Sequence, residues 1–415
     1  TMDGIDFSTY APRDPNLIET HYNLCEVFEK TNALSSLETS VSKALQKFGK
    51  KSNLLLKKAQ LEYSLGKFDH ARATLTSINE KSLSSSKKVI FYETYGKSLD
   101  KLGNYQLAFD YFIKLNDLIS ANNVETLNKG LNYINDIKLI KESLVAKDAV
   151  VWRPTKTEVS EYKPVFLIGF PRSGTTLLDN ILSSHSLIQV VEERPLIENL
   201  KRMLFGPMTL KNLNSLTNNK INQLRDIYFS ALRKNLIILP ETKIIVDKFP
   251  LNIVHTPLIL RVFPEAKFIF SLRHPCDCIL SCFMQNFKIN IAMSNFLSLK
   301  TSAILYDEVM TLWESCEQIF SPERIYIKYE DVVNDLKYGV QPALRFLDLD
   351  WDPNLLNYQQ TALSKGFIKT PSYNQVVQKL TNQPIGRWKN YHSHFTQFLP
   401  KLKVWLKKFE YEFDQ

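Results

Sequence analysis

Residues 164–178 read PVFLIGFPRSGTTLL, and this stretch decides the fold. The apolar run from Pro164 to Gly169 is typical of a buried parallel strand, and the leucines after Thr176 begin a helical pattern. In a glycine-bounded loop between a strand and a helix, backbone N–H groups converge on phosphate oxygens, and the positive end of the helix adds to the attraction. The stretch therefore predicts a strand, a phosphate-binding loop and a helix, in that order.

The loop departs from the nucleotide triphosphatase pattern G-x-x-x-x-G-K-[ST] at one position. Gly169 and Gly174 fit the pattern, but Thr175 stands where the lysine is expected. Because that lysine spans the β- and γ-phosphates, we expect a nucleotide without a triphosphate here, with Arg172 supplying positive charge. A P-loop nucleotide kinase or hydrolase is an alternative, disfavoured by Thr175 and by the lack of a clear Walker-B carboxylate.

Residues 171–176 resemble the 5′-phosphosulfate loop of the sulfotransferase family, whose donor is 3′-phosphoadenosine 5′-phosphosulfate (PAPS). The resemblance implies a second element for the 3′-phosphate. Residues 266–275, AKFIFSLRHP, form an apolar run ending in Arg273, and Ser281 follows eight residues later on a helix predicted over 276–287. This is the family's arrangement, and it implies donor binding without a metal by Arg172, Ser173, Gly174, Thr175, Thr176, Arg273 and Ser281.

The segment KIIVDKFPLN at 243–252 predicts a third strand, which ends near Lys248. In the sulfotransferase family, a lysine at this strand end lies near the oxygen that bridges phosphate and sulfonate. A cation is useful there, because negative charge builds on the departing phosphate oxygen as the S–O bond breaks. The resemblance therefore implies catalytic roles for Lys248 and Arg172. A surface ion pair is the structural alternative for Lys248.

A fourth short strand, predicted over 187–191, leads to the sequence EERP at 192–195. Counted from the phosphate loop, Glu193 matches the general base of the tyrosylprotein sulfotransferases. Those enzymes continue with threonine and arginine where this chain has arginine and proline, so the acceptor contacts differ. His185 and His255 are rival bases, because small-molecule sulfotransferases use a histidine.

Two later segments also resemble parts of the sulfotransferase domain. The strand in RIYIKYED, 324–331, leads to Tyr329, which lies either beside the nucleotide or in the packing at the strand end. The segment QPIGRWKNY, 383–391, resembles the basic loop that closes over the 3′-phosphate and adenine. The resemblance implies donor contacts for Gly386 and Arg387, and we expect Trp388 to pack in the core.

A repeated pattern, L-G-x-[FY]-x-x-A, occurs at 65–71 and 102–108. Its small and aromatic positions resemble the tetratricopeptide repeat, in which two helices pack closely, and the resemblance covers about 30–120. Such arrays present a groove for peptides or protein partners. The alternative is a helical extension that only supports the next domain. We predict one further long helix over 122–145 and a linker at 151–154.

The motif order implies an α-helical repeat domain over 1–150 and a sulfotransferase domain over 151–415. The implied α/β fold is a P-loop-type, three-layer domain with a central parallel sheet. The implied reaction moves a sulfonate group from PAPS to a hydroxyl of a protein tyrosine, a carbohydrate or a lipid, and leaves the bisphosphate product PAP. The repeats would recruit a peptide or glycan acceptor. A scaffold with an inactive second domain is a further alternative, disfavoured by intact Arg172, Lys248, Arg273 and Ser281.

Composition limits the remaining classes. The chain has 415 residues, 44% hydrophobic and 23% charged, which excludes a disordered or collagenous protein. The net charge of +9 suits an anionic small molecule or an acidic acceptor better than duplex DNA. The sequence shows no apolar run long enough to span a membrane and no signal-peptide pattern at its start, so we expect a cytoplasmic protein. The bunched cysteines Cys276, Cys278 and Cys282 are expected to be structural thiols.

Overall fold

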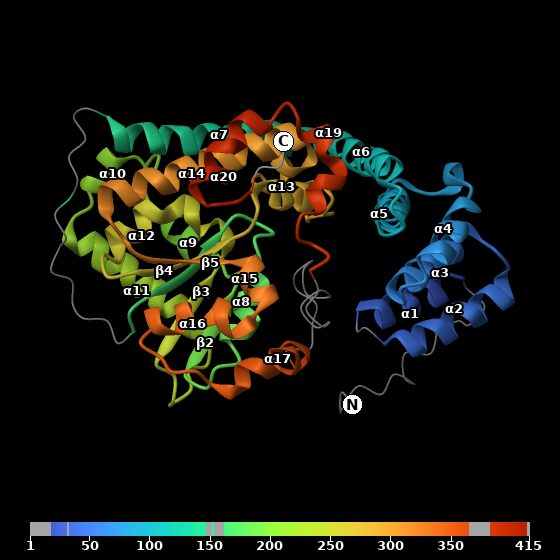
Figure 1. Cartoon of the computed structure of the whole chain (residues 1–415), viewed down its shortest axis with the longest axis horizontal. Coiled ribbons are helices and arrows are strands. Elements are labelled where there is room, and N and C mark those ends of the chain that lie inside the picture. Colours follow the sequence, from blue (N-terminus) through green and yellow to red (C-terminus); the bar gives the residue numbers. More distant parts are fainter. Residues whose placement is uncertain (1–17, 31–32, 147–151, 153–161, 365–381, 413–415) are drawn as a thin grey trace. The chain divides into compact units, whose positions relative to one another are not determined.

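The computed structural model describes residues 18–30, 33–146, 152, 162–364 and 382–412 (Figure 1). It divides into two compact units with a boundary between Val124 and Glu125. The sequence predicts a boundary near residue 150, and the structural one falls earlier because the long helix α7 (Val124–Val145) packs on the second unit. Of the predicted linker at 151–154, only Trp152 lies within the described residues, and its ring stacks on Phe320 at 4.7 Å.

The first unit consists of helices that follow one another in antiparallel pairs. They are α1 (Ile18–Lys30), α2 (Leu34–Phe48), α3 (Ser52–Ser64), α4 (Phe68–Thr76), η2 (Glu80–Ser82), α5 (Ser85–Lys101) and α6 (Tyr105–Ala121). Gly66 lies in the turn between α3 and α4 and Gly103 in the turn between α5 and α6, with φ of 74° and 76°, a left-handed conformation that favours glycine. Gly96 lets α5 approach α6, since a Cβ there would lie 3.1 Å from the ring of Phe112. The tetratricopeptide assignment itself stays a prediction.

The second unit contains a five-stranded, all-parallel sheet in the order β2-β3-β1-β4-β5. The strands are β1 (Val165–Gly169), β2 (Ile188–Glu192), β3 (Ile244–Lys248), β4 (Lys267–Leu272) and β5 (Glu323–Lys328). Each lies where the sequence predicts a strand. The three inner strands, β3, β1 and β4, are buried on both faces, as expected for parallel strands, whereas the edge strands β2 and β5 are partly exposed.

Helices cover both faces of this sheet, which gives the three layers that the sequence predicts (Figure 1). On one face, Leu167 and Val246 pack with residues of α8 (Thr175–Leu182) and α16 (Leu336–Phe346). On the other, the ring of Phe166 packs on Tyr228 of α11 (Asn218–Asn235), and Phe268 packs on Trp313 of α14 (Leu299–Phe320).

Further helices of the second unit surround these layers. They are α9 (Leu196–Arg202), α10 (Leu210–Asn214), η3 (Pro250–His255), α12 (Thr256–Val262), α13 (Pro275–Phe283), η4 (Met293–Leu297), α15 (Tyr329–Asn334), η5 (Pro353–Asn357), α17 (Tyr358–Ser364), η6 (Arg387–Tyr391), α19 (His392–Phe395) and α20 (Leu399–Lys408). Helix α13 ends four residues before the end predicted for it, at Phe283. Within the described ranges, no helix has the length and apolar character needed to cross a membrane.

Helix α7 is fixed to the second unit by polar contacts and by close packing. Lys141 Nζ lies 2.5 Å from Glu308 Oε2 on α14, and the backbone N–H of Leu210 donates to Ser143 Oγ at 3.0 Å. Gly130 makes room for the neighbouring segment, because a Cβ there would lie 2.2 Å from Ser294 Oγ. The predicted helix over 122–145 is therefore confirmed as an element, but it packs with the α/β domain.

The parallel sheet brings the chemistry-bearing segments to one edge. Glu192 ends β2, Lys248 ends β3, Gly169 ends β1 and Leu272 ends β4, and these strands are neighbours in that order. The loops that follow carry the predicted site residues. Ligands of open parallel sheets bind at this carboxyl edge, so the topology itself places a candidate site here.

Candidate active site

The loop from Gly169 to Gly174 has a backbone that only glycine can provide at its two ends. Gly169 and Gly174 have φ of 154° and 99°. A Cβ on Gly169 would lie 2.6 Å from the carbonyl oxygen of Ser271, and one on Gly174 would lie 2.6 Å from Cδ2 of Tyr329. Arg172, between them, also has a positive φ of 70°. The loop is thus held tightly against β4 and α15.

The hydroxyl groups in this loop and directly after it are buried. Ser173, Thr175 and Thr176 are 1%, 3% and 6% exposed. Among the described residues, the Oγ of Ser173 has no hydrogen-bond partner. Helix α8 begins at Thr175, directly after the loop, so its positive end faces the same space. Buried hydroxyls at a helix start are the donors that a phosphate-type group needs.

The predicted 5′ and 3′ motifs meet in space. Arg172 Nε donates to Ser281 Oγ at 3.0 Å, although the two residues lie far apart in the sequence. Arg273 Nη1 donates to the carbonyl of Arg172 at 3.1 Å. The Arg273 guanidinium also lies over the ring of Tyr329, 5.0 Å from its centroid. Four of the residues predicted to bind the donor therefore form one connected group.

Both arginines remain charged at neutral pH. Burial lowers the pKa of Arg172 to about 10, with Arg273 as a smaller, repulsive contribution. Burial also opposes the charge of Arg273, but anionic neighbours led by Asp277 more than offset it, and the pKa of Arg273 is raised. Arg273 Nε has no partner within the part of the chain that the structure describes. Buried donors normally have a partner, and a ligand oxygen is one group that would satisfy this one.

A carboxylate that the sequence did not single out ties the carboxy-terminal loop to this group. Asp277 on α13 is 1% exposed and accepts the backbone N–H groups of Gly386 at 2.7 Å and of Trp388 at 2.9 Å. Arg273 Nη2 donates to the carbonyl of Pro384 at 2.6 Å. The predicted closing loop thus reaches the 3′ motif, and Arg387 follows Gly386 at the start of η6.

Trp388 is 1% exposed, which confirms the prediction of a core residue. Its ring stacks on His274, with centroids 5.1 Å apart. The predicted structural thiols lie close by and are buried. Cys282 Sγ donates to the carbonyl of Pro171 at 3.3 Å, and burial raises the pKa of the Cys278 thiol. Cys282 therefore packs against the phosphate loop.

The predicted base and the predicted cation are in direct contact. Lys248 Nζ lies 2.8 Å from Glu193 Oε1, and the backbone N–H of Glu193 donates to the carbonyl of Lys248 at 2.8 Å. Lys248 is fully buried, whereas the side chain of Glu193 is 41% exposed. Glu193 has a positive φ of 47°, so the chain turns sharply as it leaves β2. The surface ion pair considered for Lys248 is therefore wrong, because the ammonium lies inside the domain.

Two more carboxylates face Lys248. Glu192 Oε1 lies 3.5 Å from Nζ, as expected from the register that pairs Glu192 with Lys248 across β2 and β3. Asp179 Oδ2 on α8 lies 3.6 Å from the same atom. Burial alone would lower the pKa of Lys248, but the carboxylates, led by Asp179, more than offset it and raise that pKa.

Asp247, the neighbour of Lys248, belongs to the opposite face of the sheet. Successive side chains of a strand alternate, and Asp247 Oδ2 accepts from the hydroxyl of Tyr228 on α11 at 3.2 Å. Burial raises the pKa of Asp247 to about 7. This carboxylate lies one residue before the end of β3, in the part of a strand where a Walker-B residue lies, but its contact with Tyr228 lies on the face away from α8.

The two rival histidines have structural partners. His185 precedes β2, whereas Glu193 follows it, so the two lie at opposite edges of the sheet. The ring of His185 accepts the backbone N–H of Leu187 at 3.1 Å and lies 3.1 Å from the carbonyl of Asp350. His255 Nε2 lies 3.2 Å from Glu198 Oε2, and burial lowers the pKa of His255. Of the two, only His255 remains on the side of the strand ends.

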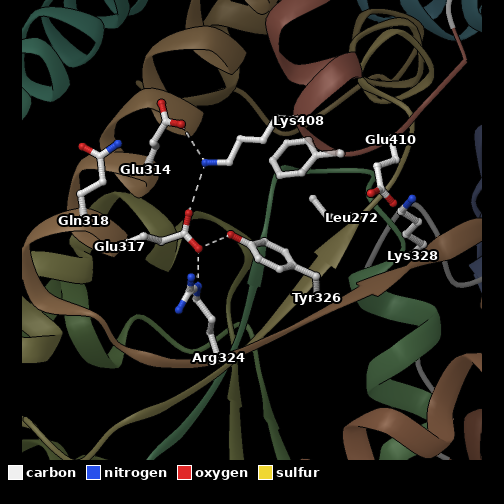
Figure 2. Close-up of a pocket in the computed structure, with 10 residues that line it drawn as sticks. Leu272, Glu314, Glu317, Gln318, Arg324, Tyr326, Lys328, Lys408 and Glu410 are labelled. Atoms are coloured by element: carbon white, nitrogen blue, oxygen red, sulfur yellow. Dashed lines mark hydrogen bonds and ion pairs between the residues drawn. The ribbon is translucent and has the colours of Figure 1, made fainter.

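A pocket of about 520 Å³ lies elsewhere, beside the edge strand β5 and between α14 and α20. Figure 2 shows that several of its charged side chains bind one another: Glu317 accepts from Arg324 and Tyr326, and Lys408 contacts Glu317 at 3.3 Å. Because these charges are already neutralised, the pocket does not compete with the strand ends as a candidate active site.

The sequence model of the sulfotransferase family matches residues 164–353. This range contains the phosphate loop, the Glu193–Lys248 pair and the Arg273 motif that the structure brings together. These residues therefore form a domain of the sulfotransferase family.

Related sequences agree with this assignment. A protein of Aquifex aeolicus (strain VF5) described as uncharacterized is 26% identical over 328 residues, which are 76% of this chain and 41% of that protein. A protein-tyrosine sulfotransferase of Drosophila melanogaster is 22% identical over 54% of this chain and 46% of its own length. Protein-tyrosine sulfotransferase 1 of Danio rerio is 21% identical over 54% of this chain and 65% of its own length. The chain thus spans less than two thirds of each relative.

Two solved structures are also similar. The sulfotransferase domain from the Synechococcus PCC 7002 olefin synthase aligns with 63% of this chain and all of its own, with 20% identity and a TM-score of 0.43. The sulfotransferase domain from the curacin biosynthetic pathway aligns with 62% of this chain and all of its own, with 18% identity and a TM-score of 0.42.

Proposed function

We propose that this protein transfers a sulfonate group from PAPS to an acceptor hydroxyl. The observation that carries the proposal is the contact between Glu193 and Lys248, 2.8 Å apart at the carboxyl edge of the sheet. Next to it, on the neighbouring strand β1, begins a phosphate loop. A carboxylate base and a buried cation beside such a loop suit the in-line displacement of a bisphosphate leaving group.

Several features fit the donor. Ser173 Oγ and Arg273 Nε are buried hydrogen-bonding groups whose partners are absent from the described residues. A second basic group would bind the other phosphate of the donor. It consists of Arg172 and Arg273, with the hydroxyl of Ser281 beside them. Gly386, held by Asp277, would bring backbone close to the nucleotide, and Tyr329 would flank it beside Gly174. Thr175 in place of the usual lysine fits a donor without a triphosphate.

In the proposed reaction, Glu193 takes the proton of the acceptor hydroxyl as its oxygen attacks sulfur. Lys248, Arg172 and the N–H groups of the loop stabilise the charge that grows on the phosphate oxygen as the S–O bond breaks. Glu193 is the only one of the pair with an exposed side chain, 41% against 0% for Lys248, so it is the member that reaches an acceptor. Arg273 and Ser281 hold the other end of the donor.

For the acceptor we propose a protein hydroxyl, with tyrosine first. Two relatives named protein-tyrosine sulfotransferases support this choice. The net charge of +9 favours acidic acceptors. Arg194 and Pro195, which follow the base, differ from the tyrosylprotein enzymes, so the sequence preference around the acceptor would differ as well. We further propose that the amino-terminal helices recruit a long acceptor.

Transfer of isotope-labelled sulfonate from PAPS to separate peptide, glycan and lipid pools tests the proposal. We expect label on tyrosine-containing peptides and none on peptides with phenylalanine instead. Thermal shift with the 3′,5′-bisphosphate in the presence of a chelator tests the donor site. Stabilisation that persists without divalent metal is expected, and stabilisation by ATP but not by the bisphosphate would favour a kinase and overturn the proposal.

A further inference from the structure

Lys248 is a buried cation with an excess of carboxylates around it. Its ammonium is fully buried and faces Glu193 at 2.8 Å, Glu192 at 3.5 Å and Asp179 at 3.6 Å. A buried charge is costly unless it is paired, so at least one of these groups must remain ionised for Lys248 to keep its proton.

The three carboxylates differ in how freely they can move. The side chain of Glu193 is 41% exposed and that of Glu192 is 21% exposed, whereas that of Asp179 is fully buried. Asp179 also lies within α8, one turn after the phosphate loop, where the helix fixes its backbone. Asp179 is therefore the counter-ion of Lys248 that cannot leave.

We propose that Asp179 is a positioning residue, which keeps Lys248 protonated and aimed at the donor while Glu193 works as the base. The proposal rests on the proposed function, because it concerns the roles of Glu193 and Lys248 in sulfonate transfer. When Glu193 accepts a proton, it loses its charge, and Lys248 loses its nearest partner. Asp179, which is fully buried and fixed on α8, then remains beside Lys248 as its partner and opposes the release of its proton in the dry interior.

The groups that face Lys248 predict the direction of the effect. Asp179 on α8 and Glu192 and Glu193 at the end of β2 raise the pKa of Lys248, while burial lowers it. Removing the charge of Asp179 leaves burial less opposed, so the pKa of Lys248 falls. The basic limb of the pH profile should then move to lower pH.

The experiment compares wild type with Asp179→Asn between pH 7 and 9, a range that lies below the pKa of about 10 of Arg172. Affinity for the 3′,5′-bisphosphate, measured by calorimetry, should hold to high pH in wild type and fall at least tenfold across this range in the variant. The rate of transfer should show the same shift in kcat, and Asp179→Glu should restore the wild-type profile. A variant profile that superimposes on that of wild type would overturn the proposal.

Two control variants test whether the position of a carboxylate, and not only its charge, determines its effect on Lys248. Asp247→Asn makes the same substitution beside Lys248 but on the opposite face of the sheet, where Asp247 contacts Tyr228, and should leave the basic limb unmoved. Glu192→Gln removes a nearer but more exposed carboxylate, so its shift should be smaller than that of Asp179→Asn. A larger shift for Glu192→Gln would assign the anchoring role to Glu192 instead.

A second readout needs no ligand. The ¹³Cε resonance of Lys248, assigned by its loss in Lys248→Arg, should titrate at lower pH in Asp179→Asn, whether or not the chain transfers sulfonate. Failure of the proposed function would abolish bisphosphate binding in wild type but leave this shift intact. If Asp179→Asn does not fold, Asp179→Asn/Lys248→Met should fold, because no unpaired charge remains. An unfolded double variant would contradict the pairing.

Discussion

In the proposed reaction, Glu193 and Lys248 carry opposite charges, lie in direct contact and have different roles. They come from the ends of neighbouring strands and meet at 2.8 Å. Their exposure differs, and this difference supports the proposed roles: the base must reach an acceptor, whereas the cation must stay in the dry interior, where its charge has most effect.

Glu193→Gln should lower turnover about 100-fold or more, because the amide keeps the shape of the side chain but cannot take a proton. Affinity for the bisphosphate should change little, since the donor contacts come from the loop and the arginines. Single-turnover transfer and calorimetry measure the two quantities. His255→Gln is the control, and it should keep most of the activity. Normal turnover in Glu193→Gln, with loss in His255→Gln, would move the role to the histidine.

The strands and the phosphate loop could be predicted because their signals are local. Each strand is one short apolar run, and the loop is fixed by Gly169 and Gly174. Asp179 and Asp277 were missed because their partners are distant in sequence. Each has only a weak local signal: Asp179 lies four residues after Thr175, and Asp277 four residues after Arg273. Helical spacing would have placed each aspartate near its motif, but it would not have identified the residue that the aspartate contacts.

At the scale of elements, Asp277 couples α13 to the carboxy-terminal loop. Asp277→Ala removes the acceptor for the N–H groups of Gly386 and Trp388, and thus the support of η6. We expect affinity for the bisphosphate to fall at least fivefold, while Asp307→Ala, which loses a contact between α14 and α20, should bind normally. Equal affinity in both variants, measured by calorimetry, would refute the coupling.

The burial of Asp247 between β3 and α11 makes stability depend on pH. The pKa of Asp247 is about 7 in the folded chain, against an ordinary value near 3.8. Because the folded state binds the proton more tightly, this contribution is complete below pH 4 and is lost as pH rises toward 7. Asp247→Asn should therefore flatten the dependence of the melting temperature on pH between about pH 4 and pH 7. A wild-type curve that the substitution leaves unchanged would mean that Asp247 does not titrate there.

At the scale of the whole molecule, the structure sets where the chain can be divided. The periodicity of residues 124–145 predicts a helix but cannot say which domain it packs on, so the sequence placed the boundary after it. The contacts of Lys141 and Ser143 assign that helix to the α/β domain. A truncation meant to preserve this domain must therefore keep α7.

Deleting residues 1–123 should leave bisphosphate affinity intact, because every donor residue lies beyond Pro164. If the amino-terminal helices recruit a long acceptor, KM for that acceptor should rise, while KM for a short peptide with the same tyrosine should not. Steady-state transfer with the two acceptors measures the difference. If the ratio of the two KM values is the same before and after truncation, in a protein that stays folded by circular dichroism, recruitment is ruled out.

The ion pair at the strand ends has a consequence for fidelity. In the proposed reaction, Glu193 rests against Lys248 before an acceptor arrives. The carboxylate oxygen of Glu193 that contacts the ammonium is already occupied, so it is not available to accept a proton from a water molecule. An activated donor waiting in the site is thus kept from futile hydrolysis. In this proposal, an acceptor hydroxyl that competes for Glu193 frees the base, so transfer begins only once an acceptor is bound.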